Sequence, residues 1–257
     1  MKARLTVLGS GTSMGVPTIG CDCTVCHSSD PRDRRTRPSV LVEYDDKTVL
    51  IDTTPDFREQ AIREQIHKLD AVLYTHAHAD HILGIDDLRP LSFHHKPGKL
   101  PLYACPDAAD FIRNMFRYIF DADYKFGGLA QVQMKTISGP VELFGARFEP
   151  VKVLHGDTEI VGYRFGSAAY LTDHSEIPEE SFAQLNGLDI LFLDALRHRP
   201  HPTHSTVDNS LRIVERVKPK RAFFTHICHD LPHEATNAAL PPHVRLSYDG
   251  MKLEFEI

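Results

Sequence analysis

The strongest constraint on this chain is the stretch Thr-His-Ala-His-Ala-Asp-His at positions 75–81, which directly follows a mainly apolar run at 70–74. The apolar run predicts a short buried strand. Side chains of an extended segment alternate between two faces, so His76 and His78 share one side. The Asp-His pair comes a step later, where the chain turns, and it approaches the same cleft from another direction. Four metal-competent side chains directed in two ways predict two adjacent metal ions.

This motif is similar to the signature of the metallo-β-lactamase superfamily. The resemblance implies an α/β fold, the four-layer αββα metallo-β-lactamase sandwich, with a dinuclear metal cleft at one edge. It covers nearly the whole chain, because later metal motifs follow in the superfamily's order. A chain of 257 residues with no evident linker is long enough for one large α/β domain. Residues 1–257 are therefore expected to form a single domain.

Three further metal-competent residues, His155, Asp173 and His226, each follow an apolar strand pattern. Alpha/beta folds commonly place their sites at such strand ends. Imidazole suits zinc and carboxylate also admits manganese, so two divalent cations, Zn²⁺ or Mn²⁺, are expected. The resemblance implies that one metal is held by His76, His78 and His155, the other by Asp80, His81 and His226, and that Asp173 bridges them.

Asp52 ends another buried strand pattern, at residues 48–52. A carboxylate at a strand end beside a histidine cluster suits the orientation of a ligand imidazole. The superfamily usually reads Asp-x-Gly at this position, whereas this chain has Asp52-Thr53-Thr54. The local turn therefore departs from the family pattern.

Cys21, Cys23 and Cys26 form a C-x-C-x2-C pattern, and three thiolates at this spacing can hold three corners of a tetrahedral structural Zn²⁺. An odd number of cysteines without an export signal favours metal binding over disulfides. Such a site would staple the loop at 21–38, which has few apolar residues of its own. The candidates for the fourth ligand are His229, which is preferred, and the alternatives Cys228 and His27.

The cysteine pattern resembles a narrower subfamily, the cyclic-phosphate phosphodiesterases of the phosphonate-degradation (carbon–phosphorus lyase) pathway. In that subfamily three cysteines near the N-terminus and a histidine near the C-terminus form a structural zinc site. The resemblance implies a metal-dependent hydrolase in which water activated by two cations attacks a small phosphodiester, such as a cyclic ribose phosphate. His204 aligns with a histidine beside the scissile phosphate and would protonate the leaving oxygen. Asp80 would orient the nucleophile as well as bind metal.

Other functions remain open from the sequence. The glycine-rich turn at 9–17 is similar to that of the tRNA 3′-processing endonuclease branch, tRNase Z. The formal net charge of −6 and the lack of a basic arm-like insertion argue against nucleic acid as a partner. A thioester or lactam hydrolase is disfavoured by His204 and the cysteine pattern. A non-catalytic metal-binding module is disfavoured by the complete ligand set.

The segment 106–134 is rich in aromatic residues, including Phe126, and is expected to pack in the core, with a lid over the cleft as the alternative. No apolar run reaches transmembrane length, and the start of the sequence lacks a signal-peptide pattern. We therefore expect a cytoplasmic protein with no membrane partner. Its partner is expected to be a small-molecule phosphodiester, and the resemblance implies a homodimer.

Overall fold

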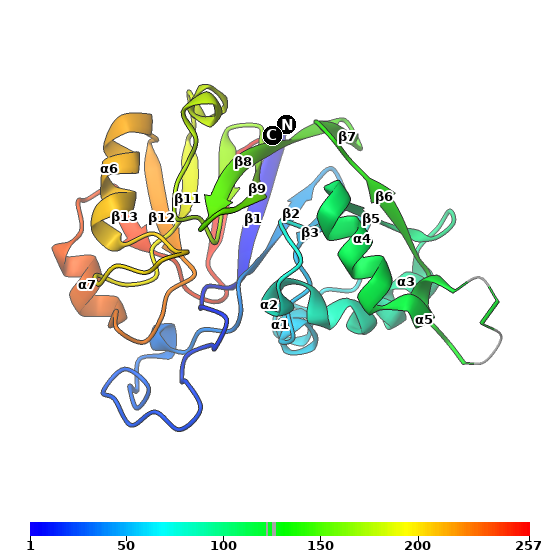
Figure 1. Ribbon diagram of the computed structural model, residues 1–257, viewed down its shortest axis with the longest axis horizontal. Helices are drawn as coiled ribbons and strands as arrows, with labels where there is room; N and C mark the ends of the chain where they lie inside the picture. The colour runs from blue at the N-terminus through cyan, green and yellow to red at the C-terminus, as the bar shows by residue number, and fades with distance from the viewer. Residues whose placement is uncertain (122, 125–126) are drawn as a thin grey trace.

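Two β-sheets packed face to face form the centre of the molecule, and helices cover the outer face of each sheet (Figure 1). The structure is a computed structural model that describes residues 1–121, 123–124 and 127–257. Within these residues each sheet has seven strands. The four layers confirm the expected αββα sandwich.

The first sheet is antiparallel at one end and parallel at the other. Because parallel strands need crossover connections, helices accompany its parallel half. Its strands, in spatial order, are β14 (Lys252–Glu256), β1 (Lys2–Gly9), β2 (Ser39–Tyr44), β3 (Lys47–Ile51), β4 (Ala71–Leu73), β5 (Leu100–Ala104) and β6 (Val132–Thr136).

The second sheet repeats this division, with antiparallel pairing from β7 to β10 and parallel pairing from β10 to β13. The two halves of the chain thus build similar sheets, although their sequences show no evident repeat. Its strands, in spatial order, are β13 (Val244–Leu246), β12 (Arg221–Thr225), β11 (Ile190–Asp194), β10 (Ala168–Leu171), β9 (Thr158–Phe165), β8 (Ala146–His155) and β7 (Val141–Leu143).

Alternation along the strands divides the apolar side chains among three clusters. In β4, Ala71 and Leu73 belong to the cluster between the sheets, together with Phe148 and Phe192 of the other sheet. Val72, between them in sequence, instead joins the cluster under the helices of the first sheet. A third cluster lies under the helices of the second sheet. Burial on both faces explains why the central strands read as continuous apolar runs.

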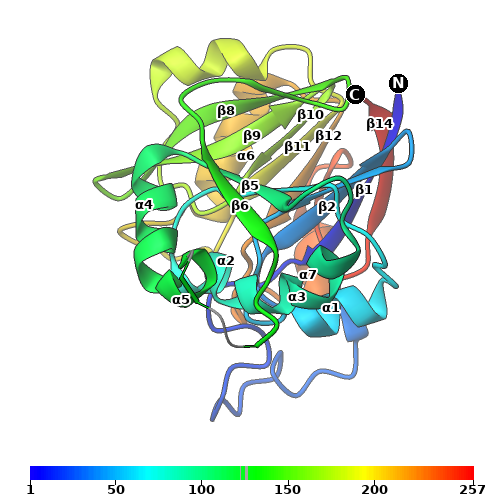
Figure 2. The ribbon, with the colours of Figure 1, turned by 90° about the vertical axis from the view of Figure 1, so that its right-hand side faces the viewer.

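The helices divide between the outer faces of the two sheets (Figures 1 and 2). Helices α6 and α7 lie over the second sheet, and the others lie over the first. Among the described residues, no helix is both long and apolar enough to cross a membrane. The helices are α1 (Phe57–Arg63), α2 (Ala79–Ile82), α3 (Arg89–His94), α4 (Pro106–Met115), α5 (Arg117–Phe120), α6 (Val207–Val217) and α7 (His233–Ala239), with 3-10 turns at Pro31–Asp33, Leu83–Leu88 and Glu179–Leu185.

The aromatic segment 106–134 forms α4, α5 and the beginning of the edge strand β6. Ile112 and Ile119 are buried in the cluster under the first sheet's helices, whereas Phe111 and Tyr118 are exposed. Residues 122, 125 and 126 lie outside the described part of the chain, so the expectation for Phe126 concerns a residue without a described position. A lid role for this segment stays a prediction.

Candidate metal centre

The first sheet contributes four of the predicted ligands from the connection between β4 and α2. Tyr74 and Thr75 follow the strand and are buried, and His76 comes next. His78 is the extended residue that precedes α2, and Asp80 and His81 lie in the first turn of that short helix. Because the chain changes from strand to helix here, the pair His76 and His78 and the pair Asp80 and His81 approach the same cluster from different directions, as the spacing of the motif predicts.

The second sheet contributes three single residues from strand ends. His155 is the last residue of β8, Asp173 follows β10, and His226 follows β12. Asp173 and His226 have φ values of +59° and +56°, and Asp52 at the end of β3 has a φ of +67°. A left-handed backbone at non-glycine residues is uncommon and costs energy, and such strain concentrates at functional sites. The side chains of all three residues contact other members of the cluster.

Asp173 lies at the centre of the seven predicted ligands. Its carboxylate oxygens are 3.3 Å from His81 Nε2, 3.2 Å from His226 Nε2 and 3.9 Å from His76 Nε2. Asp80 lies 3.4 Å from His81 Nε2 and 3.6 Å from His226 Nε2.

The rings of the other histidines complete the group. The His76 centroid is 4.6 Å from that of His78, and the His78 centroid is 5.0 Å from that of His155. The structure therefore brings all seven predicted ligands together.

In three of the predicted ligand histidines, the ring nitrogen that faces away from the cluster is held by a hydrogen bond. His81 Nδ1 donates to Asp52 at 2.8 Å, His155 Nδ1 donates to the Asp173 carbonyl oxygen at 2.7 Å, and His76 Nδ1 is 3.0 Å from the Thr75 hydroxyl. Asp52 also accepts from the backbone and the hydroxyl of Thr75. Asp52 thus has the contacts expected of an orienting carboxylate, although Asp52-Thr53-Thr54 departs from the family pattern.

The inward atoms of the cluster fit divalent cations. Among the described residues, Asp80 Oδ2 and the Nε2 atoms of His76, His81 and His226 are buried without a hydrogen-bond partner. Buried polar atoms rarely remain unpaired, because each unpaired group costs roughly 1–3 kcal/mol. Imidazole nitrogens and carboxylate oxygens that converge without partners are the donors that Zn²⁺ or Mn²⁺ binds. Asp80, His81, Asp173 and His226 place ligand atoms within 4.8 Å of one another.

The pKa values show how this cluster is charged without metal. Burial alone would raise the pKa of Asp173, but the charges of His226 and His81 outweigh burial and hold that pKa well below its ordinary value. Burial would lower the pKa of His226, yet Asp173, Asp80 and Asp194 raise it to about 9. Burial would also lower the pKa of His81, but the charges of Asp173, Asp80 and Asp52 raise it well above its ordinary value. Two carboxylates therefore face two imidazolium groups.

His204 lies beside this cluster, on the loop before α6. Its ring stacks on His226 at a centroid distance of 4.5 Å and meets the edge of His155 at 4.7 Å. Its Nδ1 donates to Asp194 at 2.7 Å. Burial, together with the charge of His226, lowers the pKa of His204 to about 4.

Asp194 is a residue of this site that the sequence reasoning missed. It ends β11, is fully buried, and lies 3.5 Å from His226 Nδ1 as well as accepting from His204. Burial raises its pKa to about 7. A signal was available, because Asp194 ends an apolar strand just as Asp52 does.

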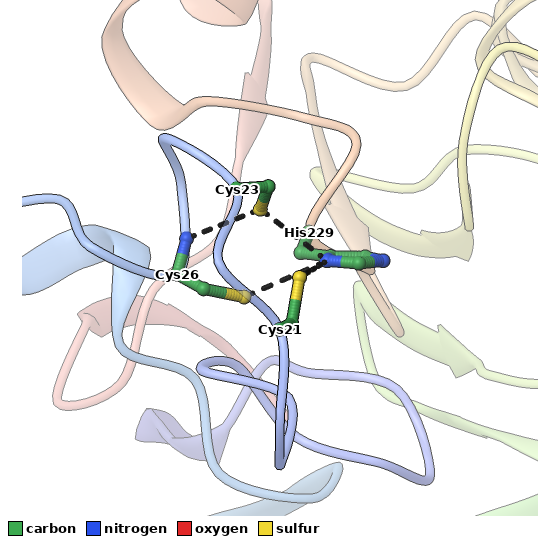
Figure 3. Close-up of side chains that lie close together, drawn as sticks. All are labelled: Cys21, Cys23, Cys26 and His229. Atoms are coloured by element: carbon green, nitrogen blue, oxygen red, sulfur yellow. Dashed lines mark hydrogen bonds between the residues drawn. The ribbon is translucent and has the colours of Figure 1, made fainter.

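A second cluster lies in the loop after β1, which projects from the body of the molecule (Figure 1). The His229 Nδ1 atom lies 3.1 Å from Cys21 Sγ, 3.4 Å from Cys23 Sγ and 3.5 Å from Cys26 Sγ (Figure 3). Four such atoms within 4.8 Å of one another suit a tetrahedral metal. The backbone N–H of Cys26 is the main cause that lowers the pKa of Cys23 to about 6, which favours a thiolate.

The alternatives for the fourth position lie elsewhere. Cys228 accepts a hydrogen bond from the backbone of Asp230, and the exposed His27 lies 3.4 Å from Asp22. Arg35, in the loop at 21–38, is fully buried and donates to the carbonyl oxygens of Cys228, at 3.0 Å, and Leu231. It fastens the cysteine loop to the segment that carries His229.

The fold and the site together define a candidate metal centre at strand ends, of the kind found in metal-dependent hydrolases. The profile of the Beta-lactamase superfamily domain matches residues 47–227, so the chain belongs to that superfamily. A crystal structure described as a new diphosphatase from the PhnP family is 63% identical, covers 99% of this chain and 98% of its own, and superimposes with a TM-score of 0.94. The chain's place within the superfamily is therefore the PhnP family, which confirms the subfamily resemblance.

Two curated relatives are more distant. A protein from Porphyromonas gingivalis named octanoyltransferase is 38% identical over 254 residues, which are 97% of this chain and 51% of that protein. The chain thus spans about half the length of that relative. A ribonuclease Z from Bradyrhizobium diazoefficiens is 29% identical over 150 residues, which are 55% of this chain and 48% of that protein.

Proposed function

We propose that the protein is a dinuclear metal-dependent phosphodiesterase that hydrolyses a small phosphodiester. The observation that carries the proposal is the position of His204, held by Asp194 and packed against ligand histidines of both halves of the metal centre. Metal-dependent hydrolysis of a phosphate ester is aided by electrophilic cations and by a proton donor for the leaving oxygen. His204 lies next to two of the predicted metal ligands, His155 and His226, where such a donor would act.

In this proposal the predicted ligands form two sets, one for each of two divalent cations. Two bound divalent cations lower the pKa of water and neutralise charge on phosphoryl oxygens. Two such cations opposite Asp80 and Asp173 leave the cleft positive, which favours an anionic substrate. One cation would be held by His76, His78 and His155, the other by Asp80, His81 and His226, with Asp173 shared.

His204 is the proposed general acid. Because its Nδ1 donates to Asp194, the transferable proton resides on Nε2. Its pKa is low in the metal-free cluster, but a phosphate anion bound against it supplies the opposite charge that favours the protonated ring. Asp194 fixes the orientation of this ring and limits its rotation, while Asp80 orients the attacking water as well as binding metal.

The cysteine cluster is proposed to bind one structural Zn²⁺ through Cys21, Cys23, Cys26 and His229. Such a site joins two segments that are far apart in sequence and holds a loop with little apolar surface of its own.

The protein is further proposed to form a homodimer. Size-exclusion chromatography with light scattering tests this by measuring the molar mass in solution.

The names of the relatives supply alternative substrates to test. The PhnP-family structure is described as a diphosphatase, so a diphosphate is a second candidate substrate. The ribonuclease Z likeness keeps precursor tRNA in the panel, and the octanoyltransferase likeness adds an octanoyl ester. The acidic net charge of −6 weighs against tRNA.

The test is hydrolysis by the metal-loaded protein of bis(p-nitrophenyl) phosphate, ribose cyclic phosphates, a dinucleoside diphosphate, precursor tRNA and p-nitrophenyl octanoate. We expect turnover of the phosphodiesters, and loss of turnover in Asp80→Ala and His204→Ala. His198→Ala, which changes an exposed histidine on the same loop, is the matched control. Turnover of the diphosphate, the octanoyl ester or tRNA alone, or an unaffected Asp80→Ala variant, would contradict the proposal.

A further inference from the structure

The loop that carries His204 also holds a second histidine in a fixed position. Backbone hydrogen bonds of 3.0 and 3.1 Å close the base of the loop between residues 196–197 and 205–207. Inside the loop, the Arg197 guanidinium donates to the carbonyl oxygens of residues 199 and 200, both at 3.2 Å. Pro200 and Pro202 flank His201 and restrict its backbone. A loop fixed in this way preorganises a side chain for binding.

The hydrogen bonds of His201 determine which ring nitrogen carries the proton. The backbone N–H of Thr203 donates to His201 Nδ1 at 3.3 Å, and the Thr203 hydroxyl lies 3.2 Å from the same nitrogen. Because a backbone N–H can only donate, Nδ1 is an acceptor and the neutral ring carries its proton on Nε2. His204 has the opposite arrangement, since its Nδ1 donates to Asp194. The two neighbouring imidazoles therefore have complementary hydrogen-bonding roles.

His201 lies at the margin of the metal centre. Its ring centroid is 5.0 Å from that of His204, with the rings tilted by 47°. His204 in turn contacts His155 and His226. His201 is partly exposed, so its ring is accessible to a bound molecule. Two imidazoles at this spacing can reach different oxygens of one phosphoryl group.

We propose that His201 is a substrate-positioning residue whose neutral Nε2–H donates a hydrogen bond to a non-ester oxygen of the phosphoryl group at the metal centre. This inference rests on the proposed function and adds a specific role for a residue outside the metal ligands. His204 acts on the leaving oxygen, whereas His201 orients the phosphoryl group. Because His201 donates in its neutral form, its contribution does not require a change of protonation.

The kinetic test compares His201→Ala, His201→Gln and His201→Asn in metal-loaded protein with bis(p-nitrophenyl) phosphate. Losing a hydrogen bond to a charged group should lower kcat/KM by about 10- to 100-fold in His201→Ala, with unchanged zinc content and an unchanged pH profile. Glutamine places an N–H near the Nε2 position and should restore most of the loss, whereas asparagine places it near Nδ1 and should not. His198→Ala, the exposed control, should stay within about twofold of wild type, less than the loss of one such bond.

A spectroscopic test does not depend on turnover. Long-range ¹H–¹⁵N spectra of the zinc-loaded protein, assigned with the His201→Gln variant, should show a protonated Nε2 in His201 and a protonated Nδ1 in His204. Inorganic phosphate should shift the His201 Nε2 resonance and leave that of His198 unchanged.

The two proposals fail in different ways. If the wild type hydrolyses no phosphodiester, the proposed function is wrong, and the phosphate-induced shift alone decides whether His201 contacts phosphate. If the wild type is active, the inference is overturned by activity of His201→Ala within twofold of wild type, by glutamine performing no better than alanine, or by a proton on His201 Nδ1.

Discussion

Metal binding should expel protons from the cluster, and the number can be worked out from the structure. Near pH 6, Asp80 and Asp173 are ionised, since the pKa of Asp173 lies well below its ordinary value and the charge of His81 outweighs burial to lower that of Asp80 too. His81 and His226 are protonated, because the pKa of His226 is raised to about 9 and that of His81 well above its ordinary value.

The other ligand imidazoles add little to this count. Burial lowers the pKa values of His76, His78 and His155, so at pH 6 those rings hold less of their proton than a free imidazole does. Metal ligation requires neutral imidazole, and therefore loading the cluster should release about two protons per chain. Bound water adds little at this pH, because its pKa on zinc is about 7.

The assay is isothermal titration of metal-stripped protein with Mn²⁺ at pH 6 in two buffers of different ionisation enthalpy. Manganese is chosen because it prefers oxygen and nitrogen ligands over the thiolates of the cysteine cluster. His226→Gln removes one of the two charged rings and should reduce the release to about one proton. A wild-type release below about half a proton, or no change in His226→Gln, would refute this assignment of charge.

Four other results are expected. The melting temperature of metal-free protein, followed by circular dichroism, should fall as the pH rises from about 6.5 to about 9. The pKa of His226 is raised to about 9 in the folded protein, so protonated His226 stabilises the fold below this range and the stabilisation is lost as the pH rises through it. A melting temperature that does not change with pH would contradict this. His204→Gln should lower kcat by about 10²- to 10⁴-fold with unchanged metal content by elemental analysis. Asp52→Asn should weaken active-site metal binding by about 10- to 100-fold in a chelator competition, since the His81 imidazole loses its negatively charged orienting partner. Wild-type affinity in this variant would count against that role. Cys26→Ser should lose one zinc per chain and melt at a lower temperature, whereas Cys105→Ser, outside the cluster, should do neither.

The sequence predicted which side chains gather at this site because the predicted ligands obey local rules. His76, His78, Asp80 and His81 lie in one motif, whose alternation and turn determine the directions of the side chains. The remaining ligands each end a recognisable apolar strand, and the ends of adjacent strands meet at one edge of a sheet. The spacing of the three cysteines predicted that their thiols would gather for the same reason, that of short-range geometry.

The features that the sequence did not predict depend mainly on contacts between residues that are far apart in the chain. The burial of Arg35 depends on carbonyl groups near residue 230, and no local pattern encodes such a pairing. Asp194 acquires its role only when the loop after β11 folds back to place His204 against it. The strand β6 is a half-exposed edge strand with a short apolar pattern, so its periodicity was too weak to identify it within an aromatic segment.

The most direct test of the account is anomalous diffraction from crystals of the protein loaded with manganese, combined with elemental analysis. The account predicts two manganese peaks per chain about 3.5–4 Å apart, as in other two-metal sites, with Asp173 between them. A single peak, an empty cluster after loading, or metal bound away from Asp173 would contradict it.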